Sequence, residues 1–322
     1  MNKIANDISL YRSEIMGVAT LMILLGHSVF YGQGYIDYGC LQDIFTLGYC
    51  GVDIFLFLSG FGLTFSMRKN DTRTFYEHRL LRIVPSVFAI MFLNVLVNIK
   101  HLGFYMFNPL YWFGCYWYIG FILGGYLLFP YIYRVIKRFG YIVFVISTLL
   151  SFLLFLPFLF TGHGESSAST CLVTRIPIFV LGACFGVGGQ IELYSKYIIV
   201  SATIFGLIAL WPFYYFDNLG GNVTMNTYYV FTLLTPCIVL GISCCLKLLS
   251  SQKILFEFCR CFGKYSLEIY LVQVTIMSPI MLFLHKHGIP MLLNVFLSFS
   301  IVFLLSVSMK FVTDKSKIIL KL

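Results

Sequence analysis

The feature that most constrains this fold is a series of apolar runs, each about as long as a membrane is thick. A helix needs roughly 20 mostly apolar residues to cross the hydrocarbon core of a bilayer. The chain contains about ten such runs, at residues 15–33, 46–67, 83–100, 111–133, 141–160, 172–190, 197–216, 227–249, 266–284 and 289–311. We therefore predict an all-α polytopic membrane protein of about ten transmembrane helices, with one domain covering residues 1–322.

The composition agrees with this prediction. Of the 322 residues, 59% are hydrophobic and only 11% are charged, whereas soluble domains have about 25% charged residues. These charges are too few to cover a water-exposed surface, so we expect the lipid bilayer to be the chain's main surroundings. The net charge of +9 is explained by basic cytoplasmic loops, and we expect no nucleic-acid partner.

The basic residues also predict how the spans are oriented. With both termini in the cytoplasm, 19 of the 22 Lys and Arg residues fall on the cytoplasmic side, as the positive-inside bias requires. The densest cluster lies between residues 68 and 82, directly after an apolar run. The exceptions on the outer side are Lys100, Arg175 and Lys286.

The first residues and the cysteines give no sign of a signal peptide or a metal site. The first fifteen residues are polar, so we expect no cleavable signal peptide. The ten cysteines form no CxxC pair and no metal-ligand spacing, so we predict core cysteines and no metal site.

Two titratable side chains lie inside predicted spans. His27 is about 18 Å above the inner end of the first span, and Asp53 is about 22 Å above Arg68 on the second, from a rise of 1.5 Å per residue. Ionisable groups within a membrane are costly and often functional. We expect a catalytic pair at matched depth, in which Asp53 orients His27 as a general base. The alternative is a buried polar pair in which each group satisfies the other.

Arg79 and Arg82 are three residues apart near a cytoplasmic helix end, so a helix places them on one face. Pro85 suits the first turn of the span that follows. Two forked guanidinium groups can bind a phosphate or pyrophosphate. The alternative is that both arginines only anchor the topology from the cytoplasmic side.

Arg175 is on the side that the orientation rule does not predict. It could form an ion pair with Asp53 or Glu165, bind an anionic group, or extend to the outer interface. Gln273 lies in the ninth predicted span and needs a hydrogen-bond partner if it faces the bundle interior.

Aromatic residues cluster at the outer start of the fourth predicted span, at Tyr111, Trp112, Tyr116 and Trp117. Such a cluster is typical of an interfacial aromatic belt. The alternative is a stacking surface for a sugar.

Several segments, in order along the chain, resemble the acyltransferase-3 family of bacterial membrane O-acyltransferases. LMILLGHS, ending just past His27, resembles the first helix of that family with its histidine, and GVDIFLFLSGF (51–61) resembles the second. FYEHRLLRIVPS (75–86) is similar to the family's Arg-x-x-Arg-Ile-x-Pro segment. The later matches are WYIGFILGGYLLFP (117–130) with Trp117 and Tyr126, RIPIFVLGACFG (175–186) with Arg175, and GKYSLEIYLVQ (263–273) with Gln273.

The chain departs from the family pattern at two positions. Where the family often has Arg or His eleven positions before the histidine, this chain has Met16, with Arg12 one helical turn earlier. The late histidine of the family is Gln273 here. These departures keep open the alternative of a non-catalytic homologue.

The resemblance implies an O-acyltransferase, usually an acetyltransferase, of the bacterial cytoplasmic (inner) membrane. It implies that acyl-CoA is the donor substrate, with no tightly bound cofactor, and that an envelope or extracellular polysaccharide is the acceptor. Arg79 and Arg82 would bind the donor phosphates, and His27 and Asp53 would be catalytic. Substrate contacts would come from Trp117, Tyr126, Arg175 and Gln273. The competing class is a transporter or polymerase of lipid-linked glycans.

Overall fold

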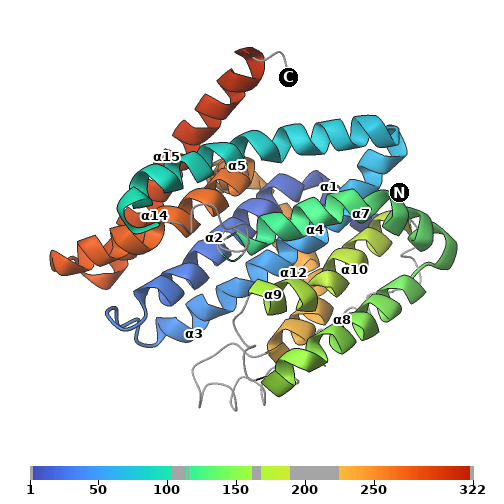
Figure 1. Ribbon diagram of the computed structural model, residues 1–322, viewed down its shortest axis with the longest axis horizontal. Coiled ribbons are helices and arrows are strands. Elements are labelled where there is room, and N and C mark those ends of the chain that lie inside the picture. Colours follow the sequence, from blue (N-terminus) through green and yellow to red (C-terminus); the bar gives the residue numbers. More distant parts are fainter. Residues whose placement is uncertain (1–2, 103–113, 115, 162–167, 189–224, 320–322) are drawn as a thin grey trace.

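The computed structural model describes residues 3–102, 114, 116–161, 168–188 and 225–319, and every regular element among them is a helix. The long helices lie side by side in a bundle, and α15 extends from it toward the C-terminus (Figure 1). The helices are α1 (Lys3–Leu10), α2 (Arg12–Gly32), α3 (Leu41–Thr46), α4 (Cys50–Lys69), α5 (Thr72–Leu102), α7 (Trp117–Phe139), α8 (Ile142–Thr161), α9 (Ala168–Thr174), α10 (Ile176–Val187), α12 (Met225–Leu248), α13 (Lys253–Lys264), α14 (Ser266–Lys286) and α15 (Met291–Ile319).

The helices confirm an all-α polytopic membrane protein. In the described residues, eight helical stretches are long and apolar enough to cross a membrane, and the shorter apolar stretch Ile142–Leu156 in α8 corresponds to a further predicted span. The predicted span at 197–216 lies outside the described residues. One prediction about a helix start is wrong. Pro85 is not in a first turn, because α5 begins at Thr72 and the proline lies inside it.

Helix α4 is the central element of the described bundle. It packs against α10 on one side and α2 on the other (Figure 1). Glycines make the close contact between α4 and α10 possible. A side chain at Gly60 of α4 would collide with the backbone of α10, and a side chain at Gly182 of α10 would collide with the backbone of α4. On the α2 side, Gly48 and Gly51 meet the α2 backbone in the same way. Small residues at helix crossings allow the close van der Waals packing that holds membrane helices together.

Helix α13 packs along the first part of α2. A side chain at Gly17 would collide with the backbone of Cys259, and one at Gly263 would collide with the backbone of Ser13. The same crossing carries a buried acid, since Arg260 Nε donates to Glu14 Oε1 at 2.7 Å. This contact fixes the start of α14, which follows α13 after a single residue.

The glycine contacts predict a difference between two identical substitutions. Gly182→Ala should lower the free energy of unfolding by about 1–3 kcal/mol, the usual cost of overpacking. Gly124→Ala should be neutral or slightly stabilising, because nothing lies within 4 Å of the added methyl group and alanine favours helix. Thermal unfolding of both purified variants in detergent measures the difference, and equal midpoints would contradict the packing described above.

Candidate active site

A cavity that is partly open to solvent lies between α2, α4, α5, α7 and α14. Each long helix presents one face to it, as the spacing of the lining residues shows. From α2 these residues are Arg12, Met16, Thr20 and Ile23, and from α4 they are Val52, Phe55, Ser59 and Leu63. Intervals of three and four residues are the repeat of a single helix face, so the cavity follows the two helices along their length.

One end of the cavity carries three arginines. Arg12 comes from α2, and Arg79 and Arg82 come from α5, so the two predicted donor-binding residues do share a cavity wall. The lining residues include no Asp or Glu. In the described part of the chain none of the six ion pairs involves these arginines. Arg12 and Arg79 are partly buried and Arg82 is exposed. A cation that is partly removed from water is costly without a partner, so this end suits an anionic ligand.

Aromatic and glycine contacts hold two of these guanidinium groups in place. Arg79 lies over the rings of Phe75 and Tyr126, with its Cζ 5.8 and 6.0 Å from the centroids. Arg12 lies against Gly62, where an added Cβ would be 2.9 Å from its Nη2. The Nε atoms of both arginines are buried without a hydrogen-bond partner. Tyr126, predicted to bind substrate, therefore lies at the arginine end of the cavity.

The opposite end of the cavity leads to His27. This residue is four positions beyond Ile23, on the face of α2 that lines the cavity. The side chain of Gln273 of α14, which lines the cavity and is 1% exposed, lies next to the imidazole. The Gln273 that replaces the family's late histidine thus contacts the predicted base. The rings of Tyr31 and Tyr49 lie 5.6 and 6.1 Å from that of His27.

The predicted contact between Asp53 and His27 is wrong in this structure, because the two groups differ in both depth and direction. Gly48 packs on Met22 and Gly26 of α2, and Gly51 packs on the backbone of Ala19. This register places Asp53 about seven residues, or roughly 10 Å, below His27. No hydrogen bond reaches either carboxylate oxygen of Asp53.

The direction in which Asp53 points follows from the two faces of α4. Asp53 belongs to the stripe that continues through Phe57, Gly60 and Thr64, and this stripe packs against α10. The cavity is lined by the neighbouring stripe, which begins at Val52.

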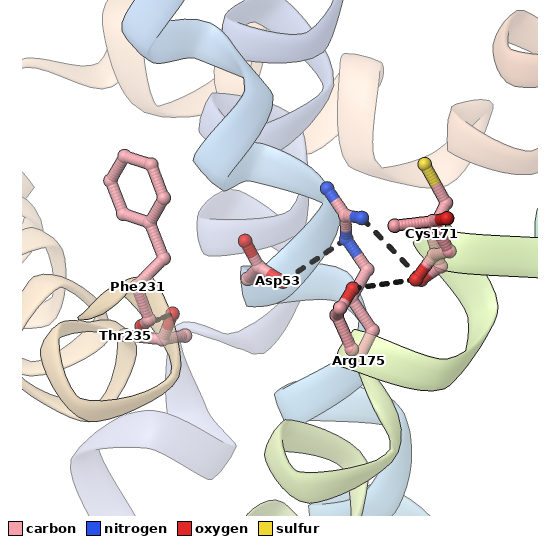
Figure 2. A network of polar contacts seen from close by, with 7 residues as sticks. Asp53, Cys171, Arg175, Phe231 and Thr235 are labelled. Atoms are coloured by element: carbon pink, nitrogen blue, oxygen red, sulfur yellow. Dashed lines mark hydrogen bonds and ion pairs between the residues drawn. The ribbon is translucent and has the colours of Figure 1, made fainter. Parts of the chain in front are cut away.

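Asp53 instead pairs with Arg175, as Figure 2 shows. Arg175 Nε lies 3.3 Å from Asp53 Oδ1, and the two side chains are 3% and 1% exposed. Arg175 also donates to the carbonyl of Cys171 at 3.4 Å, and its guanidinium lies over the ring of Trp117, 5.2 Å from the centroid. Of the partners considered for Arg175, Asp53 is therefore present, while Glu165 lies outside the described residues. The predicted substrate contacts of Arg175 and Trp117 stay predictions, and the structure gives both residues a partner inside the protein.

The aromatic cluster near the start of α7 is only partly described. Tyr116 is buried, and its hydroxyl hydrogen-bonds with Asn94 at 3.1 Å and Thr275 at 2.7 Å. Trp117 contacts Arg175, while Tyr111 and Trp112 lie outside the described residues. Tyr116 therefore faces protein rather than the membrane interface.

The sequence interpretation missed several polar residues of the cavity wall, among them Ser59, Tyr118 and Tyr270. The side chain of Ser59 lies next to that of Tyr118, and Tyr118 and Tyr270 pack with ring centroids 5.0 Å apart. Arg12 was considered only as a replacement for an absent residue. The available signal was periodicity, because Arg12 precedes His27 by fifteen residues, about four helical turns, and therefore shares its face.

The comparison with family models decides between the function classes left open by the sequence. Residues 16–311 match the model of the acyltransferase domain family that the sequence motifs resemble. This chain belongs to the acyltransferase-3 family. No curated protein and no solved structure gave a significant match. The acyltransferase-3 match covers His27, Arg79, Arg82 and Gln273, while Arg12 lies before its start.

Membership of the acyltransferase-3 family makes this protein a membrane acyltransferase, and the transporter or polymerase class is set aside. The arrangement of residues fits acyl transfer. The cavity has a basic end that suits an anionic substrate, and one helical turn beyond its last α2 residue lies an imidazole that can accept a proton.

The ion pair predicts a stability effect for Asp53. Asp53→Asn leaves the buried Arg175 cation without its partner, and this loss should cost about 3–5 kcal/mol of unfolding free energy. The double variant Asp53→Leu with Arg175→Met removes both charges and should unfold closer to the wild-type temperature. Thermal unfolding in detergent compares the three proteins. A single variant as stable as wild type would contradict a structural role for the pair.

Proposed function

We propose that this membrane acyltransferase moves an acyl group, most simply acetyl, from cytoplasmic acyl-CoA to a hydroxyl of an envelope or extracellular polysaccharide. In this proposal the protein resides in the bacterial cytoplasmic membrane with both termini in the cytoplasm, and acyl-CoA is a substrate rather than a resident cofactor. The observation that carries the proposal is one cavity with three arginines at one end and Gln273, which lies next to His27, at the other.

The charge of the cavity supports a donor with several phosphates. Three guanidinium groups that share one site repel each other, and the described cavity wall supplies no carboxylate to compensate. Guanidinium groups bind phosphate oxygens through paired, charge-assisted hydrogen bonds. The phosphates of CoA would supply the missing negative charge, with Arg12 joining the two arginines predicted from the sequence.

The length and lining of the cavity support a long, mainly apolar arm. The cavity lining on α2 runs from Arg12 to Ile23, which corresponds to about 16 Å along the helix, and His27 follows one turn further on. The wall between them is mostly apolar, with hydroxyl groups at Thr20, Ser59 and Tyr118. An extended pantetheine arm can span such a distance and presents amide groups that hydroxyls can bind.

The chemistry follows from His27 at the end of the cavity. The imidazole accepts the proton of the acceptor hydroxyl as its oxygen attacks the thioester carbonyl carbon. A C–O bond forms, the C–S bond breaks, and the leaving thiolate receives the proton, which releases CoA. Gln273 lies next to the imidazole and limits its movement in this proposal. Asp53 acts in this proposal through Arg175, by fixing the position of α10 against α4.

Removal of the base should separate turnover from donor binding. His27→Ala should lower turnover about 10²- to 10⁴-fold, the usual contribution of general-base catalysis, with the Kd for acetyl-CoA nearly unchanged. His287→Ala is the matched control, since this exposed histidine ends α14 away from the cavity lining. Polysaccharide acylation in cells with equal membrane levels, and acetyl-CoA binding to purified protein, provide the two readouts. Normal acylation by His27→Ala would overturn the role of the base.

Replacement of arginine by lysine should weaken donor binding although the charge is kept. Arg12→Lys, Arg79→Lys and Arg82→Lys each lose a paired hydrogen bond to phosphate. A hydrogen bond to a charged group contributes about 1.5–3 kcal/mol, so each Kd for acetyl-CoA should rise roughly tenfold or more. Arg134→Lys is the control, because Arg134 is exposed on α7 and does not line the cavity. If all four variants bind acetyl-CoA equally well, the arginines do not form the donor site.

A further inference from the structure

Tyr270 lies at the His27 end of the cavity. It is on the face of α14 that lines the cavity, three residues and so about one turn before Gln273. Gln273 lies next to His27. The ring of Tyr31 is 5.6 Å from that of His27, and Tyr31 and Tyr270 are within electrostatic range of each other. Tyr270 therefore belongs to the group of side chains that surrounds the His27 end of the cavity.

The start of α7 orients this hydroxyl. The backbone of Tyr118, second residue of α7, lies next to the Tyr270 side chain, and the two rings pack with centroids 5.0 Å apart. The first N–H groups of a helix have no acceptor inside the helix, and this helix end carries partial positive charge. An N–H of this helix start is therefore available to donate to the phenol oxygen, which leaves the O–H of Tyr270 to donate to another group.

A second observation indicates that a ligand belongs here. Gln273 is 1% exposed and lines the cavity, yet its Oε1 has no hydrogen-bond partner among the residues that the structure describes. A buried amide oxygen without a donor costs about 1–3 kcal/mol, and a donor N–H of a bound molecule would remove that cost. The amide of the pantetheine arm nearest the thioester is such a donor. This contact would bring the thioester carbonyl between His27 and Tyr270.

We infer that Tyr270 is a catalytic residue that stabilises the oxyanion of the acyl-transfer step, an inference that rests on the proposed function. When the acceptor oxygen attacks, the carbonyl π electrons move onto the carbonyl oxygen. The Tyr270 O–H donates a hydrogen bond to that negative oxygen and keeps its own proton. The carbonyl then re-forms, the C–S bond breaks, and the thiolate takes the proton held by His27. Donors placed where charge develops contribute strongly to such steps.

Three tyrosines of different position provide the test. Tyr270→Phe keeps the ring and removes the donor, so turnover should fall about 10²- to 10³-fold while the Kd for acetyl-CoA stays within about twofold. Tyr126→Phe, beside Arg79, should change the Kd more than the turnover. Tyr131→Phe, exposed on the same helix as Tyr126, should change neither. Turnover is measured as release of CoA thiol from acetyl-CoA by purified protein supplied with envelope polysaccharide.

A second variant tests the O–H itself. Incorporation of 3,5-difluorotyrosine at position 270 keeps the shape but lowers the pKa of the phenol, so the donor is lost on deprotonation. Turnover of this protein should therefore decline at a lower pH than that of wild type, a shift that a purely structural role does not produce. Full turnover by Tyr270→Phe, or identical pH profiles, would overturn the inference alone. Failure of the wild-type protein to release CoA thiol would overturn the proposed function together with it.

Discussion

The constraint on which the described structure depends is the close packing of α4 between two neighbouring helices. Glycines at its crossings with α2 and α10 bring the backbones into direct contact, so no side chain separates them. Within a membrane there is little hydrophobic gain from helix association, and contact at short range supplies the attraction. The tight crossings also fix the register of α2 against α4. That register determines which residues face the cavity and which face α10.

The charged groups of the described spans fall into two classes once their partners are known. Asp53 and Arg175 neutralise each other at 3.3 Å in the interior, with the ring of Trp117 over the guanidinium. Arg12, Arg79 and Arg82 share a cavity in which the described wall supplies no acid. In the first class the two charges compensate each other inside the protein, and the pair stabilises the bundle. The second class has no ion-pair partner among the described residues, and for this reason we place the donor phosphates there rather than at Arg175.

The residues at the catalytic end of the cavity come from three different helices. His27 and Gln273 come from α2 and α14, and Tyr270 and Tyr118 come from α14 and the start of α7. Each of these helices contributes its cavity-facing stripe, so the site is assembled from side chains that are far apart in the sequence. The substitution of Gln273 for the family's histidine keeps a hydrogen-bonding group against His27 but removes one that could carry a proton. Proton transfer in the proposed mechanism is accordingly assigned to His27 alone.

The sequence by itself determined the fold class, the family and the identity of the main candidate residues. Apolar runs of membrane length permit only helices, because lipid offers the backbone no other hydrogen-bond partners, and the spacing of Arg79 and Arg82 already placed them on one helix face. Tertiary structure alone decided the partners. Depth along a helix can be counted from the sequence, and on that count Asp53 matched His27. The rotation of one helix against another depends on side-chain and glycine packing across the crossing, and that packing turned Asp53 toward Arg175, placed Gln273 against His27 and brought Arg12 to the other two arginines.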